Sequence, residues 1–246
     1  MRRALVALSL AFALNAAAQS EDLINPDRPG IADGSQTVGR GRFQIEVGAE
    51  RDDDEGARNL ITPLLLRYGL TDRLELRVEG NGYQHLSVGG FTASGFAPLS
   101  IGAKFHVADH PSLGIIARVF PPSGSGEFRS EETTADLRLA TDVELNDRWS
   151  VEGNIGAVST TDDVGRFTAG LAALTVTYAP TKKLGIFVDA GLQSPEERFG
   201  SYGLILDTGA TWLLDRNTQL DASIGWGAHG LTPPQVFFAA GVSRRF

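Results

Sequence analysis

Ionisable side chains recur at alternate positions along many short stretches of this chain. In residues 74–79, Leu-Glu-Leu-Arg-Val-Glu, charged groups alternate with aliphatic ones. Successive side chains of a β-strand point to opposite faces of a sheet, so these charged groups share one face. Acidic and basic groups on one face can pair across neighbouring strands or line a wet passage. The spacing therefore predicts ion pairing or solute conduction.

The charged face extends over most of the chain. An arginine or lysine facing lipid at the bilayer midplane would cost about 2–4 kcal/mol, so in a membrane protein these groups must face a lumen. For each of them, filling a narrow wet interior is the simpler role, and lining a conduction path is the alternative. The residues that we predict to line the lumen are Glu46, Arg67, Glu75, Arg77, Glu79, Lys104, Arg118, Asp136, Arg138, Asp142, Glu144, Asp189, Asp207 and Asp221.

Elements with a period of two must position these groups, and the period holds from Gly39 to the end of the chain. Twelve runs alternate, with no helical pattern between them, which predicts an all-β fold: a single antiparallel up-and-down transmembrane β-barrel of about 12 strands. Every second connection is a tight turn, and the others are looser. The tight turns fall at 69–73, 108–112, 146–148, 180–183 and 215–218; the loops include the acidic residues 52–58 and the long segments 80–95 and 120–133.

Large aromatic residues lie within three positions of every tight turn, on the apolar face of each strand. They are Tyr68, Phe105, Trp149, Tyr178 and Trp212. Amphipathic rings at one height near one rim are typical of a membrane–water interface. A soluble barrel with an apolar interior and scattered core aromatics is the alternative. The common height favours an outer-membrane barrel whose termini are both periplasmic.

The two ends of the chain carry further signals. Residues 1–18 combine two arginines, a short apolar stretch and a small-residue exit, which predicts a secretory signal peptide. Residues 19–38 are polar and aperiodic, and we expect a periplasmic arm or a lumen plug, with the barrel over 39–246. The alternating C-terminus ends in Phe246, which resembles the strand signal read by barrel-insertion machinery, although Arg244 replaces the aromatic residue often seen before it.

Composition excludes several classes of function. The chain has no cysteine and a formal net charge of −8, so thiol chemistry, cysteine-ligated metals and nucleic-acid binding are not expected. The four histidines form no metal-ligand spacing with carboxylates, and no phosphate-binding loop is present. We predict no cofactor, no metal and no enzymatic activity. A lipid-modifying outer-membrane enzyme is a minor alternative, and a structural or surface-recognition barrel with a closed lumen is the main one.

Three motifs near the N-terminus point to a family. They are Asp27-Arg28-Pro29-Gly30, the Gly-x-Phe-Gln-x-Glu stretch at 41–46, and the hairpin Gly-Leu-Thr-Asp-Arg at 69–73. The sequence from Ile24 onward resembles the outer-membrane proteins associated with the meta-pathway of phenol degradation, which are described as transporters. The resemblance implies a Gram-negative outer-membrane location, outer-membrane lipid as a partner, and passage of small aromatic or other apolar compounds.

Overall fold

The computed structural model describes residues 22–195, 197–229 and 236–246, and the predicted signal peptide over 1–18 lies outside these ranges. The described residues form fifteen strands and one short 3-10 turn. In the first half they are β1 Phe43–Asp54, β2 Ala57–Ile61, β3 Leu64–Gly69, β4 Leu74–Gly80, β5 Tyr83–Val88, β6 Phe91–Phe96, β7 Leu99–Asp109, β8 Ser112–Phe120 and η1 Gly126–Phe128. The second half gives β9 Thr134–Asn146, β10 Trp149–Asp162, β11 Gly165–Tyr178, β12 Leu184–Gln193, β13 Gly203–Asp215, β14 Thr218–His229 and β15 Val236–Arg245.

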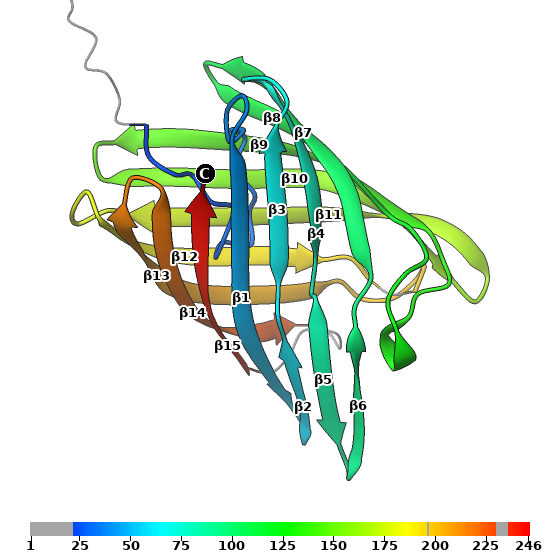
Figure 1. Cartoon of the computed structure of the whole chain (residues 1–246). Helices are drawn as coiled ribbons and strands as arrows, with labels where there is room; N and C mark the ends of the chain where they lie inside the picture. Colours follow the sequence, from blue (N-terminus) through cyan, green and yellow to red (C-terminus); the bar gives the residue numbers. More distant parts are fainter. Residues whose placement is uncertain (1–21, 196, 230–235) are drawn as a thin grey trace, which may run out of the picture.

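The strands form one closed antiparallel barrel (Figure 1). The sheet order runs from β15 back to β7 and on through β4 and β3 to β1, and β15 also pairs with β1 along its length. Because β2–β3, β4–β5 and β6–β7 each continue one strand past an interruption, the described strands occupy twelve barrel positions. Pairing of β15 with β1 closes the twelve positions, as a membrane barrel requires, and among the described strands only β6, beyond the interruptions, pairs with a single neighbouring strand, β5. The predicted up-and-down barrel of about twelve strands is confirmed.

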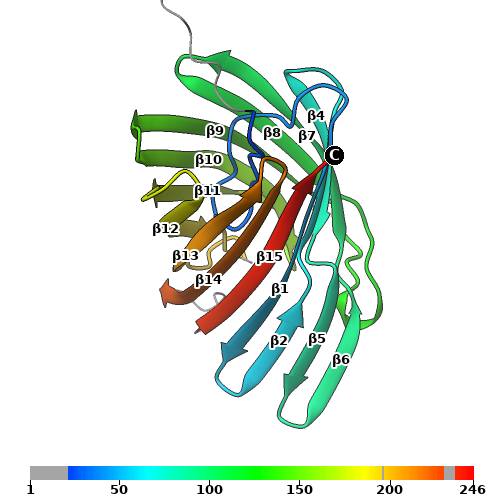
Figure 2. The same ribbon diagram turned by 60° about the vertical axis from the view of Figure 1, so that its left-hand side comes forward.

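Three neighbouring strands are interrupted at the same height. The interruptions contain Pro63, Gly82 and Pro98. Proline cannot donate to the ladder of a sheet, so each proline ends one regular run of pairing. Backbone bonds bridge the level of the breaks, with Ala97 N donating to Gly82 O at 2.8 Å. Beyond the breaks, β2, β5 and β6 continue as a flange that projects past the rest of the wall (Figures 1 and 2).

Two predicted loops are wrong. Residues 80–95 were expected to form a long loop, but β5 and β6 occupy most of this segment and are joined at Gly89 and Gly90. The acidic residues 52–58 lie in β1 and β2, with a turn at Glu55 and Gly56. Both segments extend existing strand pairs, so continued pairing satisfies their backbone groups although their composition favours turns.

In three of the five tight turns, a short polar side chain accepts hydrogen bonds from the backbone N–H groups of later turn residues. In the turn after β3, Thr71 Oγ1 accepts hydrogen bonds from the backbone N–H groups of Arg73 and Leu74 at 3.1 and 3.0 Å. Thr181 repeats this contact in the turn after β11, and Asn146 does so after β9. Short polar side chains are favoured in turns because they bond to the backbone a few residues ahead. This explains the recurrence of Thr-Asp-Arg and Asn-Asp-Arg far apart in the sequence.

Both ends of the described chain lie at the rim with the tight turns. Phe246 N donates to Phe43 O at 2.7 Å, which joins the end of β15 to the start of β1. The guanidinium group of Arg245 donates to Leu23 O at 3.1 Å, so the N-terminal segment starts at the same rim. Figure 2 shows this segment, in blue, entering the barrel from that side.

The outer face of the wall is apolar and exposed. Ile101 and Ile155 are each 63% exposed and Leu137 is 56% exposed, whereas Arg67 and Lys104 on the opposite face are fully buried. A water-soluble barrel would have the reverse arrangement. The wall is therefore that of a barrel surrounded by lipid. Within the described ranges, no helix has the length and apolarity needed to span a membrane.

Candidate functional site

The N-terminal segment, residues 22–38, lies inside the barrel and defines the site (Figures 1 and 2). Carboxylates of the wall accept hydrogen bonds from its backbone. Ile31 N donates to Asp189 Oδ2 at 3.1 Å, and Val38 N donates to Glu75 Oε2 at 2.9 Å. The segment has no regular secondary structure, so side chains of the wall satisfy backbone groups that would otherwise be buried without partners.

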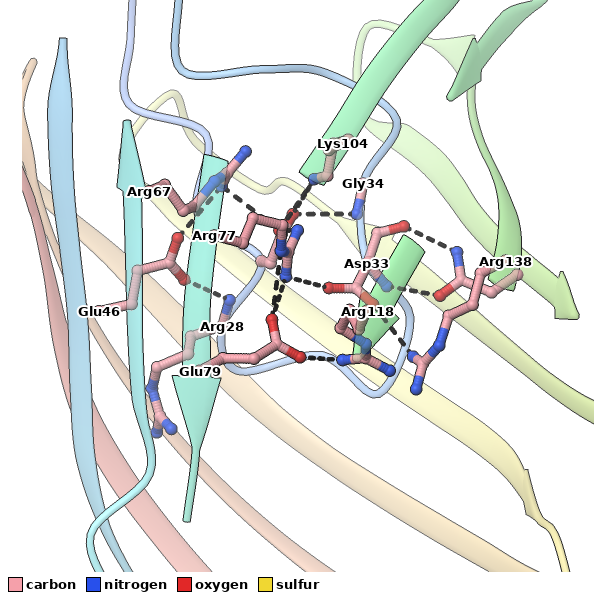
Figure 3. Close-up of polar contacts among 12 residues, drawn as sticks. Arg28, Asp33, Gly34, Glu46, Arg67, Arg77, Glu79, Lys104, Arg118 and Arg138 are labelled. Atoms are coloured by element: carbon pink, nitrogen blue, oxygen red, sulfur yellow. Dashed lines mark hydrogen bonds and ion pairs between the residues drawn. The ribbon is translucent and has the colours of Figure 1, made fainter. Parts of the chain in front are cut away.

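Asp27 is the centre of a buried ion-pair cluster. Its carboxylate accepts hydrogen bonds from Arg77 Nη1 at 2.6 Å and from Lys104 Nζ at 2.8 and 2.9 Å. Arg67 Nη1 lies 3.5 Å away and also donates to Glu46 Oε1 at 3.1 Å. Figure 3 shows these side chains converging from neighbouring strands. Asp27 thus joins the segment to β3, β4 and β7 at once.

Asp33 forms the second half of the cluster. Arg77 Nη2 donates to its Oδ1 at 2.9 Å, and Arg138 Nη1 donates to its Oδ2 at 3.0 Å (Figure 3). Arg118 lies beside this pair and contacts Glu79 and Asp136. The basic residues of β3, β4 and β7–β9 are therefore neutralised by carboxylates of both the wall and the segment.

Arg28 bonds to a different part of the wall from Asp27. Its Nη2 donates to Asp221 Oδ1 at 3.0 Å on β14. Gly48 and Gly241 are paired directly on β1 and β15 beneath this side chain. A Cβ atom at Gly48 would lie 2.5 Å from the guanidinium of Arg28, and one at Gly241 would lie 2.6 Å from it. Glycine at both positions leaves the room that this side chain occupies.

Most of the predicted lumen residues are buried and contact the segment or one another. Glu46, Arg67, Glu75 and Lys104 are fully buried, and the others are buried or half-buried. Glu144 is the exception, because it lies near the end of β9 at the turn rim and is exposed. The structure joins the basic members and their neighbouring acids into the ion-pair cluster. Their role in lining a conduction path stays a prediction.

The five predicted girdle aromatics lie beside the tight turns. Phe105 is 47% exposed and Trp212 is 55% exposed on the outer face. Trp149 and Tyr178 are directly paired across β10 and β11, with ring centroids 4.8 Å apart, and Tyr178 is half-buried by this contact. Contact with the membrane–water interface stays a prediction.

Two aromatic residues of the lumen were missed by the sequence analysis. Phe187 and Phe237 are 3% and 8% exposed, and their positions alternate with outward-facing neighbours on β12 and β15. Each lies against a glycine on the next strand, because Phe187 pairs with Gly209 and Phe237 neighbours Gly225. A phenylalanine on the charged face opposite a glycine was the signal that could have identified them.

A cavity of about 160 Å³ lies between the segment and the wall of β10–β14. The lining from the wall combines the ring of Phe187 with the polar side chains of Glu152, Thr175, Thr177 and Thr211. On the opposite side residues 24–30 of the segment, including the charged Asp27 and Arg28, complete the lining. Within the described residues, no group of three or more histidine, aspartate or glutamate side chains could hold a metal ion.

The two acids of the segment make its attachment dependent on pH. Burial raises the pKa of Asp27, but the charges of Arg67, Lys104 and Arg77 lower it by more, so the pKa lies below its usual value of 3.8. Burial and cations act in the same way on Asp33, whose pKa is also lowered. A lowered pKa in the bound state stabilises the segment above about pH 4, and this stabilisation is lost as the pH falls through the lowered pKa.

We therefore expect the segment to stay in place under mildly acidic conditions. Ion conductance in planar bilayers should be the same at pH 7 and pH 4.5, and should rise only well below pH 4. A rise that begins between pH 7 and pH 5 would contradict control by these two acids.

These features define a class: the protein has the fold of outer-membrane β-barrel channels, with an N-terminal segment inside the lumen. By sequence, the chain belongs to the family described as "Putative MetA-pathway of phenol degradation", whose family model matches residues 26–246. No curated protein sequence matches the chain.

Solved structures show the same fold. An outer-membrane channel from Pseudomonas putida F1 is similar with a TM-score of 0.65 and 17% identity, over 89% of this chain and 99% of that one. The KdgM porin has a TM-score of 0.57 and 15% identity, over 82% and 99% of the two chains. The NanC porin has a TM-score of 0.58 and 9% identity, over 81% and 98%. These similarities concern the fold, and the similar structures are channels and porins.

Proposed function

We propose that the protein is an outer-membrane channel for small aromatic compounds of about the size of phenol, with its turn rim and both termini in the periplasm. The family description names phenol degradation, and the barrel has the fold of channels. The observation that carries the proposal is the cavity between the segment and β10–β14. The protein acts in this proposal as a passage and not as an enzyme.

The size and lining of the cavity suit a ring that carries a hydroxyl group. A cavity of about 150 Å³ lined by aliphatic and aromatic side chains is known to hold benzene, and the volume here is about 160 Å³. The ring of Phe187 offers an apolar contact, and the hydroxyls of Thr175, Thr177 and Thr211 offer hydrogen bonds. Larger hydrophilic solutes would meet the ion-pair cluster around Asp27, which occupies the other half of the lumen.

Uptake into intact Gram-negative cells tests the proposal, because their outer membrane slows the entry of apolar compounds. We expect cells that express the protein to take up labelled phenol several-fold faster than cells without it. Thr177→Trp fills the cavity and should remove most of this gain. Val176→Trp places the same ring at the adjacent outward-facing position on β11 and should keep it.

A structural barrel with a closed lumen is the second candidate, and the ion-pair cluster favours it. Glu75, Arg77 and Arg138 could have formed an open polar path, but Arg77 and Arg138 both bond to Asp33 in the segment. Phenol uptake that does not change on expression of the protein would favour this candidate over the channel.

A further inference from the structure

A groove of about 480 Å³ lies on the outer face of the barrel, at the base of the flange. Ala49 of β1 and Ala240 of β15 are directly paired in it, and their small side chains leave room between the larger Leu60 and Phe238. Ala49 lies two positions beyond the exposed Val47 on β1, so the groove faces the surroundings of the barrel and not the lumen. We call this feature the flange groove.

Two arginines lie at the end of the flange groove that is farther from the tight-turn rim. Arg51 lines the groove, and Arg58 lies one row further along the hairpin of β1 and β2. Both guanidinium groups donate to the same atom, Asp53 Oδ1, at 2.9 and 3.3 Å, and their side chains are 45% and 57% exposed. A guanidinium group has five N–H donors, and these contacts use only one or two of them. Two exposed cations therefore share one carboxylate on this face.

His85 and Tyr83 of β5 border the flange groove on the side away from β15. The Nδ1 atom of His85 forms a hydrogen bond with Ser94 Oγ at 2.7 Å, so Nε2 is the ring nitrogen left for a further ligand. The exposed ring of Tyr83 packs edge-on against Phe96, with centroids 5.6 Å apart. Exposed aromatic rings of this kind are typical of a membrane–water interface. The flange groove therefore runs from the apolar face of the wall to a basic, polar end.

We propose that the flange groove binds a phosphorylated glycolipid of the outer leaflet, the lipid A part of lipopolysaccharide. An acyl chain lies along Ala49 and Ala240, and a phosphate contacts Arg51 and Arg58. Arginine suits this role because its planar fork of donors matches two phosphate oxygens at once. An amphiphile with an apolar chain and an anionic head is complementary to both ends of the groove. The inference goes beyond the passage of a solute, and only the choice of leaflet rests on the proposed periplasmic position of the turn rim.

Native mass spectrometry of the protein in detergent, with purified lipid A added, tests the inference. We expect one lipid A molecule to stay bound to each wild-type barrel, and lipid A without its phosphates to bind about tenfold more weakly or less. Arg51→Gln combined with Arg58→Gln should weaken the binding of lipid A by about the same factor. Arg129→Gln combined with Arg166→Gln removes the same charge from exposed positions at the same rim and should bind lipid A as the wild type does.

A second pair of variants tests the apolar half of the flange groove. Ala49→Phe fills the groove and should also weaken the binding of lipid A, whereas Ala117→Phe makes the same change at an exposed position on β8 and should not. Heat-modifiable migration in gels checks that each variant folds. If the arginine double variant binds lipid A as tightly as the wild type, or if loss of the phosphates has no effect, the inference is wrong. If Ala49→Phe instead abolishes a dimer, the groove is an interface between two copies and the inference is also wrong. Phenol uptake by the arginine double variant should equal that of the wild type, so the channel proposal is judged separately.

Discussion

Asp27→Asn is expected to open the lumen. Lys104 is fully buried, and Asp27 is its only carboxylate partner among the described residues. Removing one partner of a buried ion pair costs about 3–5 kcal/mol, because the other charge stays uncompensated. The strands keep their own hydrogen bonds, so the loss should appear as release of the segment and not as unfolding of the barrel. The population with a released segment should rise by about two to four orders of magnitude.

Single-channel recording measures this release as large openings that the wild-type protein shows rarely. Protease cleavage within residues 22–38 should increase in parallel. Asp22→Asn is the matched control, because Asp22 pairs with Arg42 and Arg245 at the rim and its side chain is 56% exposed. An exposed ion pair contributes about 0–1 kcal/mol, so this variant should behave as the wild type. Equal conductance of the Asp27→Asn variant and the wild type would show that the cluster does not hold the segment.

The sequence predicted the strands well where one face meets lipid and the other meets the lumen. In β4, each outward position must be apolar and each inward position can be charged, so the alternation is complete over Leu74–Gly80. The flange is different. In β5 and β6 the outward face carries Tyr83 and His85 beside hydroxyl residues, because it projects past the rest of the wall. Without an apolar face, the period of two disappears and the residues resemble a loop.

The position of the N-terminal segment could not be derived from its own residues. Its contacts run to side chains far along the chain: Ile31 bonds to a carboxylate 158 positions away, and Arg28 to one 193 positions away. The segment has no hydrophobic period, since its backbone bonds to wall carboxylates instead of to a neighbouring strand. The sequence showed which wall residues are charged, but pairing of the basic ones with Asp27 and Asp33 depends on the closed barrel.

The same reasoning explains the two phenylalanines that were missed. Phe187 is one of several apolar residues in β12, and its neighbours Ile186 and Val188 face outward. Asp189 lies two positions further on, so the period of two places Phe187 on the charged face. The room for a large ring on that face comes from the pairing with Gly209, and that pairing is known only once the register of β12 and β13 is fixed.

Ile155→Arg is expected to destabilise the barrel strongly in a bilayer. Ile155 lies near the middle of β10, is 63% exposed, and pairs with the outward-facing Leu139 and Ala172. An arginine facing lipid at the midplane costs about 2–4 kcal/mol, whereas the same change on a surface in water usually costs within about 0.5 kcal/mol. Denaturant titration in phosphatidylcholine vesicles, followed by tryptophan fluorescence, should give a free energy of unfolding that is about 2–4 kcal/mol lower than that of the wild type.

Val164→Arg is the matched control for this measurement. Val164 lies in the turn between β10 and β11 and is 80% exposed, at the end of the strand where the chain is in water. The cost of arginine on a barrel falls to about 0–1 kcal/mol near the interface, so this variant should unfold almost as the wild type does. The difference in unfolding free energy between the Ile155→Arg and Val164→Arg variants shows whether residue 155 faces the lipid core while residue 164 lies near its edge. If both variants lose the same small free energy, the outer face is not in contact with lipid, and the apolar surface of the barrel must be covered in some other way.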